Sequence, residues 1–293
     1  MTLLQFFLTW GAVTCLVAAV SARPAGARAG LIVATVFLAV PVFMTRPPTR
    51  AGVALLALVC FVRTADFVLD GAPGRFRARW MHLVMLVNTY EVGLQRRRID
   101  YVSAIRLAIS IALFVVGRQG LNVANGLPSW ERYAGRWTAG ALMLFVCVDA
   151  VVCLHVFVAG LLGIALPRLH DAPYRSLSVG EFWGRRWNLT VSRVLRQRCF
   201  EPLARRSVVL ALVGSFAASA ATHVYILGAA LGPGAALSCA AFFLVQPLIL
   251  LAERRLNVRH WPRLAAWVWT MSTLGLFAPL LLEPAVSLFM RKW

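Results

Sequence analysis

The fold is decided by an apolar run at residues 206–230, RSVVLALVGSFAASAATHVYILGAA, which carries no formal charge after its first residue. A helix of about 20 apolar residues spans the hydrocarbon core of a bilayer. The centre of this run is rich in Ala, Ser, Thr and Gly, residues that let membrane helices approach one another closely. The run therefore predicts a transmembrane helix packed inside a bundle.

The same pattern recurs along the chain, which is 60% hydrophobic and only 14% charged. Seven further apolar segments lie at residues 3–20, 29–45, 51–69, 99–117, 137–166, 234–252 and 262–282. Six arginines at residues 71–98 surround the apolar piece Trp80–Val87, which indicates an interfacial or re-entrant helix. The predicted fold is therefore all-α, a polytopic transmembrane helical bundle of about eight spans. We expect it to form one membrane domain over residues 1–293.

The net charge of +19 comes from 30 basic residues against 11 acidic ones, and the basic residues border the apolar segments. Connections after odd-numbered spans carry about three times as many basic residues as the other connections. By the positive-inside rule, the first group is predicted to be cytoplasmic and both termini to lie outside. Because membrane topology accounts for the basic residues, the positive charge does not indicate a nucleic-acid partner. The near-total use of Arg over Lys fits a GC-rich bacterial genome, so we expect a bacterial inner membrane.

A few polar side chains lie inside the apolar segments. Arg63 and Asp66 are three residues apart, so they share a helix face and can pair. Asp149 and His155 lie six residues apart on different faces, and each is expected to point into the bundle, because a charge in lipid is costly. The histidines and cysteines show none of the spacings of a zinc site, so no metal is expected.

The most unusual polar stretch is Ser178–Asn188, SVGEFWGRRWN, on the predicted cytoplasmic side. A cationic amphipathic helix at the membrane interface would explain its arginines and tryptophans. It would not explain why Glu181 and Asn188 stand among them. Adjacent arginines suit phosphate groups, so this face also suits the phosphorylated end of a nucleotide-bearing substrate such as coenzyme A.

His223 lies within the apolar run that follows. Ser219 precedes it by four residues and so shares its helix face, where the hydroxyl can hydrogen-bond the imidazole. A lone intramembrane histidine is either a hydrogen-bonded structural residue or, with a pKa near neutrality, a general base. The residues by themselves leave both interpretations open.

These motifs resemble a known family. Phe182–Asn188, FWGRRWN, is similar to the signature of wax-synthase-like proteins of the membrane-bound O-acyltransferase superfamily. The resemblance continues in Cys199-Phe-Glu-Pro202, in Ser219-x-x-x-His223, and in Phe242-Phe-Leu…Ala-Glu-Arg-Arg255. It covers about residues 165–260, while the N-terminal spans match only in general character.

The resemblance implies transfer of an acyl group from acyl-CoA to the hydroxyl of a lipophilic alcohol, as in wax ester synthesis. It also implies that His223 is the catalytic base and Asn188 the second catalytic residue. The residues expected to contact substrate are Glu181, Trp183, Arg185, Arg186, Trp187 and Ser219. Acyl-CoA enters as a co-substrate, no other cofactor is expected, and the remaining partners are the alcohol and membrane lipids.

Three positions depart from the pattern of the plant members. Val224 follows the histidine where an acidic residue is common, Ala220 replaces a glycine, and Gln246-Pro247 stands where His-Gly is frequent. These departures leave the identity of the acceptor open, so an acyl or acetyl transfer to a sterol, terpenoid, polyketide or sugar alcohol is an alternative. A proton-coupled transporter using the intramembrane acid and histidines is another, although no inverted repeat supports it.

If His223 and Asn188 form one catalytic site, their side chains must lie close together. If the helix starts at Arg206, His223 lies about 25 Å along it. The motif helix must then dip into the membrane from the interface to meet the histidine.

Overall fold

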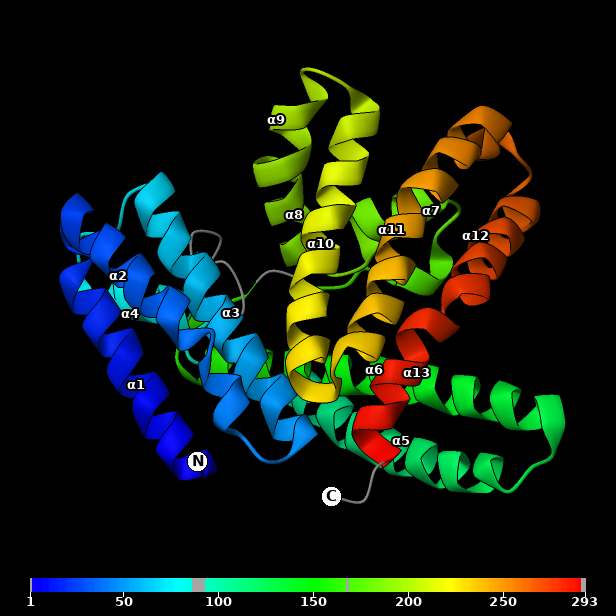
Figure 1. Ribbon diagram of the computed structural model, residues 1–293, viewed down its shortest axis with the longest axis horizontal. Helices are drawn as coiled ribbons and strands as arrows, with labels where there is room; N and C mark the ends of the chain where they lie inside the picture. The colour runs from blue at the N-terminus through cyan, green and yellow to red at the C-terminus, as the bar shows by residue number, and fades with distance from the viewer. Residues whose placement is uncertain (1, 86–92, 167–168, 291–293) are drawn as a thin grey trace. The chain divides into compact units, whose positions relative to one another are not determined.

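A computed structural model of the chain describes residues 2–85, 93–166 and 169–290, and most of this length is helical (Figure 1). The predicted all-α class is confirmed. The described residues contain only one pair of short strands, β1 (Gly93–Leu94) and β2 (Ile164–Ala165), which pair antiparallel. The chain divides into two compact units, residues 1–90, 222–236 and 293, and residues 91–221 and 237–292. The single domain expected from the sequence stays a prediction.

The first unit is built on four helices from the N-terminal part of the chain. They are α1 (Leu3–Val20), α2 (Pro24–Phe37), followed by the short turn η1 (Val40–Phe43), α3 (Pro47–Leu69) and α4 (Phe76–Val84). Pro24 and Pro47 stand in the first turns of their helices, where a missing N–H breaks no helical hydrogen bond. Small side chains in the core let the helices approach closely; the core residues are Val17, Ala18, Ala27, Ala34, Cys60, Phe67 and Leu83.

The predicted pairing of Arg63 with Asp66 is confirmed in this unit. The guanidinium lies 3.5 Å from the Asp66 carboxylate, and Nε2 of the fully buried His82 lies 3.3 Å from the same oxygen. The predicted basic segment forms α4 over Phe76–Val84. Its expected continuation to Val87 falls in residues 86–92, outside the described part.

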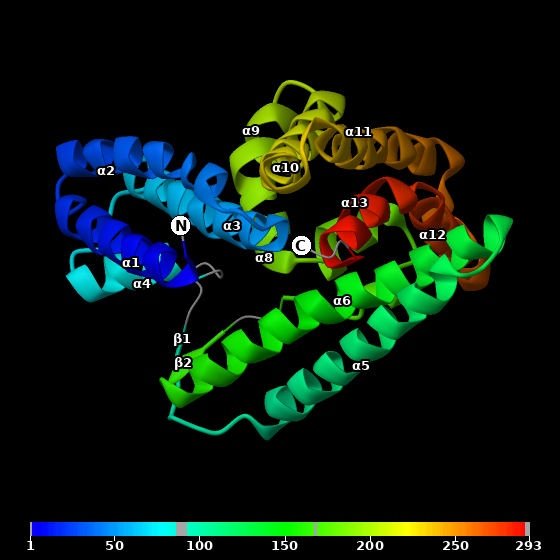
Figure 2. The same ribbon diagram turned by 60° about the horizontal axis from the view of Figure 1, so that its bottom comes forward.

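The second unit holds a long helical hairpin and the polar motif. Its elements before α10 are α5 (Tyr101–Asn125), α6 (Ser129–Leu161), η3 (Pro173–Arg175), α7 (Val179–Glu181), η4 (Phe182–Arg186), α8 (Leu189–Leu195), η5 (Arg196–Phe200) and α9 (Glu201–Ala204). Helices α5 and α6 lie side by side (Figure 2). Asp149 of α6 pairs with Arg106 of α5 and accepts a hydrogen bond from Ser110 at 2.9 Å. The acid therefore faces a neighbouring helix, as expected.

The remaining helices follow the motif. They are α10 (Val208–Leu231), α11 (Pro233–Leu256), the turn η6 (Val258–His260), α12 (Arg263–Phe277) and α13 (Pro279–Met290). A tight turn separates α10 from α11 at Gly232, whose φ of 90° favours glycine. Both α10 and α11 contribute residues to each of the two units.

All eight apolar segments expected from the sequence contain helix. Six described helical segments are long and apolar enough to cross a membrane: Pro24–Phe43, Pro47–Leu69, Tyr101–Asn125, Ser129–Leu161, Val208–Leu231 and Pro233–Leu256. The predicted span at 262–282 is instead a pair of helices that is broken before Pro279 and bent there by 53°. If this bent pair counts as one span, the described residues contain seven candidate spans. Helix α1 is apolar but shorter. These segments support an integral membrane protein. Six or seven of the described helical segments are long and apolar enough to cross a membrane, where the sequence predicted about eight.

Candidate functional site

The polar motif is not one continuous helix. Helix α7 passes into the π-helical turn η4, and α8 begins only after Asn188. Trp187 is extended, and Asn188 has the left-handed values φ 42° and ψ 63°. These two residues interrupt the helical hydrogen bonds, so the expected motif helix consists of short separate turns. Its interfacial or re-entrant placement stays a prediction.

Glu253 of α11 holds the start of the motif. Its buried carboxylate accepts the backbone N–H groups of Val179 at 2.6 Å and Gly180 at 3.1 Å, and the indole N–H of Trp269 at 3.2 Å. The first N–H groups of a helix have no partner within it, so they need an external acceptor. One carboxylate therefore joins α7, α11 and α12. No role was predicted for Glu253 from the sequence, although an acid at the end of an apolar segment is a usable signal of one.

Replacing Glu253 by leucine is expected to lower the thermal unfolding midpoint of the detergent-solubilised protein strongly. The buried Val179 N–H and the part-buried Gly180 N–H and Trp269 indole N–H lose their acceptor, at a cost of up to about 1–3 kcal/mol each. Glu253→Gln keeps one acceptor oxygen and should lower the midpoint less. The matched control is Glu201→Gln, which removes an exposed pair with Arg196 worth about 0–1 kcal/mol. An unchanged midpoint in Glu253→Leu would contradict the anchoring role.

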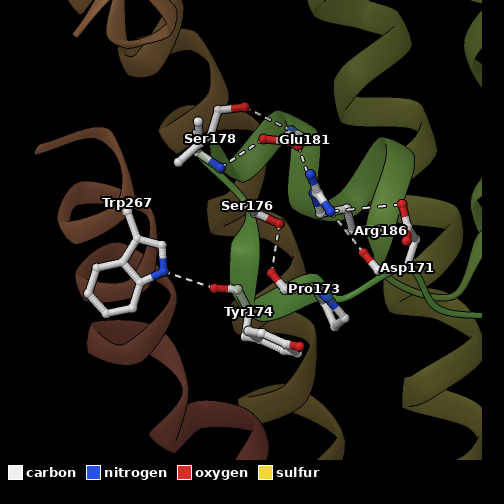
Figure 3. A network of polar contacts seen from close by, with 9 residues as sticks. Asp171, Pro173, Tyr174, Ser176, Ser178, Glu181, Arg186 and Trp267 are labelled. Carbon is white, nitrogen blue, oxygen red and sulfur yellow. Dashed lines mark hydrogen bonds and ion pairs between the residues drawn. The ribbon is translucent and has the colours of Figure 1, made fainter. Parts of the chain in front are cut away.

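A second network closes the motif on itself (Figure 3). One carboxylate oxygen of Glu181 accepts from Arg186 Nε at 2.6 Å, and the other accepts the Leu177 N–H at 2.8 Å. Arg186 also donates to the backbone oxygen of Asp171 at 3.1 Å, while the Asp171 N–H donates to the Arg186 oxygen at 2.9 Å. Glu181 and Arg186 thus stabilise the local fold, and their expected contact with substrate stays a prediction.

The connection before the motif is held from α12. The indole N–H of Trp267 donates to the backbone oxygen of Tyr174 at 2.8 Å, and the Ser176 hydroxyl donates to the oxygen of Pro173 at 2.7 Å (Figure 3). Ser178 then caps α7 by accepting the Glu181 N–H at 2.8 Å. These contacts fix the chain on the N-terminal side of the motif.

Trp183 anchors the motif in an aromatic cluster. Its ring packs edge-on against Phe216 of α10 and Phe242 of α11. Its indole N–H donates to Gln246 Oε1 at 3.0 Å, and Gln246, which is fully buried, donates in turn to the backbone oxygen of Phe242. Gln246 is one of the departures from the plant pattern, and here it supplies a hydrogen-bond acceptor for the partly buried Trp183 indole.

Trp187 and Asn188 form the turn that ends the motif. The Trp187 ring stacks on Phe182 and lies 4.6 Å from the His170 ring between centroids. The backbone N–H of Asn188 donates to His170 Nδ1 at 3.0 Å, and its side-chain oxygen accepts the Val191 N–H at 3.3 Å. Asparagine tolerates the left-handed region and caps helices well, so this position has a structural reason to be Asn. No functional role was predicted for His170 from the sequence.

Arg185 differs from its neighbour. It is exposed, and it has no ion-pair partner in the part of the chain that the structure describes. Gly184 beside it is also exposed, and a Cβ there would meet nothing within 4 Å. Of the two adjacent arginines, Arg185 is therefore the one available to an external anion.

His223 belongs to the first compact unit, whereas Asn188 and Ser219 belong to the second. Its Nδ1 lies 3.3 Å from the hydroxyl of Thr222, and Ser219 is buried. The expected hydrogen bond from Ser219 and the meeting of His223 with Asn188 both stay predictions. Within the described ranges, no group of three or more His, Cys, Asp or Glu residues is placed to hold a metal ion.

Residues 166–245 match a family model described as the membrane bound O-acyl transferase family. Among curated relatives, the chain is 27% identical over 205 residues to the probable long-chain-alcohol O-fatty-acyltransferase 7 of Arabidopsis thaliana, covering 63% of this chain and 58% of that protein. It is 44% identical over 97 residues to the probable long-chain-alcohol O-fatty-acyltransferase 9 of the same plant, which is 33% of this chain and 27% of the relative.

A third relative has a different name. The acyl-CoA–sterol O-acyltransferase 1 of Arabidopsis thaliana is 38% identical over 64 residues, 19% of each protein. The chain therefore spans well under two thirds of the length of the relatives it matches. The matched family segment contains the whole polar motif and His223.

Proposed function

We propose that the chain is a member of the membrane-bound O-acyltransferase superfamily and that it transfers an acyl group from an acyl-CoA thioester to the hydroxyl of a lipophilic alcohol. The observation that carries the proposal is the coincidence of two features. The segment that matches the family, residues 166–245, is also where the motif is built as a turn held by buried and part-buried hydrogen bonds. Functional side chains are typically held in a fixed geometry by surrounding hydrogen bonds of this kind.

His223 acts as the general base in the proposed reaction. Its imidazole removes the proton of the alcohol as the hydroxyl oxygen attacks the thioester carbonyl carbon. The tetrahedral intermediate then expels coenzyme A as the carbon–sulfur bond breaks. The thiolate takes the proton from the imidazolium, which leaves an ester, free coenzyme A and neutral His223. Phe216, which contacts Trp183 of the motif, precedes His223 by about two helical turns.

Asn188 has one side-chain group left for chemistry. Its oxygen already accepts the Val191 N–H, so the amide NH₂ is the group that can donate to a reactant. We assign it to the oxyanion that develops on the thioester carbonyl. A preorganised donor of this kind lowers the barrier because the transition state carries more negative charge than the substrate.

Arg185 is proposed to bind the phosphate groups of acyl-CoA. Arg185→Ala is expected to raise the KM for acyl-CoA about tenfold with kcat nearly unchanged, since a charged hydrogen bond made equally in ground and transition states is lost. Arg185→Lys should recover part of this loss. The exposed Arg205→Ala is the control for net charge. An unchanged KM in Arg185→Ala would remove this arginine from the binding site.

The test of the function is ester formation. Membranes containing the protein are incubated with labelled acyl-CoA of several chain lengths and with long-chain alcohols or sterols as acceptors. A sterol belongs in the panel because of the similarity to the sterol acyltransferase. New ester that requires the protein supports the proposal, and its absence with every pair rejects it. Proton-coupled uptake in place of ester would favour transport, although the pairing of Asp149 with Arg106 argues against a proton path there.

A further inference from the structure

His170 lies beside the motif turn, in a short strap of residues 169–171. Three backbone N–H groups form hydrogen bonds between this strap and residues 186–189. The Asp171 N–H donates to the Arg186 oxygen at 2.9 Å, the Leu189 N–H to the Leu169 oxygen at 2.8 Å, and the Asn188 N–H to His170 Nδ1 at 3.0 Å. Only the last of these has an acceptor that can be protonated near neutral pH.

The geometry decides the state of the imidazole. A backbone N–H can only donate, so Nδ1 must carry its lone pair, and the proton of the neutral ring is on Nε2. That Nε2 is buried and has no hydrogen-bond partner among the described residues. Such a group has no acceptor to stabilise an added positive charge. The arrangement therefore suits the neutral ring and disfavours the imidazolium.

The environment of His170 also favours the neutral imidazole. Burial lowers the pKa of His170 below its ordinary 6.5. Asp149 of α6 raises this pKa and Arg106 of α5 lowers it, and those two side chains are paired with each other. Asp171, next in the chain, lies 3.8 Å from Arg186. The neutral form therefore dominates at pH 7.

We propose that His170 is a positioning residue of the acyl-transfer site, which holds Asn188 in its left-handed turn when neutral and releases that turn when protonated. The inference rests on the proposed function, because Asn188 matters for rate only if it contacts the reacting acyl group. Protonation replaces the Nδ1 lone pair with an N–H that faces the Asn188 N–H. Two donors then oppose each other, and the side-chain hydrogen bond from the strap to the Asn188 backbone is lost.

The pH dependence follows from the lowered pKa. An unfolded chain takes up the His170 proton near pH 6.5, and the folded protein does so at lower pH. The stabilisation from this contact is therefore complete above pH 6.5 and is lost as the pH falls from there through the folded pKa. Activity should fall over the same range.

The first experiment compares the pH profile of kcat in wild type and His170→Asn. The asparagine oxygen can replace Nδ1 as acceptor but does not titrate. In wild type both His223 and His170 must be neutral, so the acid limb of log kcat should reach a slope of about two. In His170→Asn the slope should fall to about one, with kcat at pH 8 within about twofold of wild type. His170→Phe keeps a ring against Trp187 without an acceptor, and should lose about fivefold in kcat at pH 8.

A second readout needs no acyl transfer. Because an imidazolium quenches a neighbouring indole, the fluorescence of Trp187 should titrate with His170. The difference between wild type and Trp187→Phe isolates this signal, and its midpoint should lie below 6.5. The signal should vanish in His170→Asn and persist in His260→Asn, a control at an exposed histidine.

The outcomes are distinct. A slope of about one in His170→Asn together with loss of the Trp187 titration supports the proposal. A slope that remains about two, or a Trp187 titration that survives in His170→Asn, overturns it. If no donor and acceptor pair gives ester, the proposed function fails while the fluorescence titration still tests the state of His170. If ester forms but Trp187 shows no titration, the function stands and the positioning role of His170 is wrong.

Discussion

His223→Ala is expected to abolish most ester formation, lowering kcat by about 10²–10⁴-fold. The substitution removes the imidazole that is proposed to take the proton from the alcohol as it attacks the thioester. The KM values for both substrates should change little, because the base acts mainly in the transition state. The measurement is the rate of labelled ester formation under saturating acyl-CoA and alcohol.

The control for this loss is another histidine in an apolar helix. His155 of α6 contacts only the backbone oxygen of Val151 in the described contacts, at 2.9 Å. His155→Ala should therefore keep nearly full activity. A thermal unfolding midpoint for His223→Ala close to that of wild type separates lost chemistry from lost folding. Ester formation at the wild-type rate in His223→Ala would refute the assignment of the base.

Asn188→Asp is expected to lower kcat by about 10²–10³-fold while the protein stays folded. A carboxylate oxygen can still accept the Val191 N–H, and aspartate also tolerates the left-handed backbone. What the substitution removes is the NH₂ donor proposed to face the oxyanion. The rate of ester formation reports the loss of the donor, and the thermal unfolding midpoint of the same preparation reports whether the fold is kept.

Asn188→Gly is the matching variant. Glycine adopts the left-handed conformation readily but supplies neither the helix cap nor the donor. Its kcat should fall as far as that of Asn188→Asp, with a modest loss of stability of about 0.5–2 kcal/mol from the missing cap. If Asn188→Asp retained wild-type kcat, Asn188 would be a structural residue alone.

The helical framework was largely predictable because it depends on composition along the chain. Runs such as 206–230 carry their own signal, since a long uncharged helix can be stable only in lipid or in a packed core. The break before Pro279 was less visible, because a proline near the end of an apolar run can also be accommodated by a continuous helix.

The motif itself was also identifiable from the chain, but its local structure was not. Aromatics and arginines at helical spacing predicted one amphipathic helix. The turn at Trp187 and Asn188 depends on contacts with His170 and Leu169, which are far enough away along the chain to leave no periodic pattern. Arg185 and Arg186 are adjacent and chemically identical, so the sequence cannot distinguish them. In the structure Arg186 pairs with Glu181, whereas Arg185 is exposed.

The sequence by itself determined that this is a helical membrane protein with a basic aromatic motif ahead of a histidine-bearing helix, because apolarity and motif spacing are properties of the chain. Tertiary structure alone decided what holds that motif. The Val179 N–H meets Glu253 across 74 residues, and the Trp183 indole meets Gln246 across 63. A buried donor can be satisfied by any acceptor that packing brings within reach, so its partner is known only once the helices are packed.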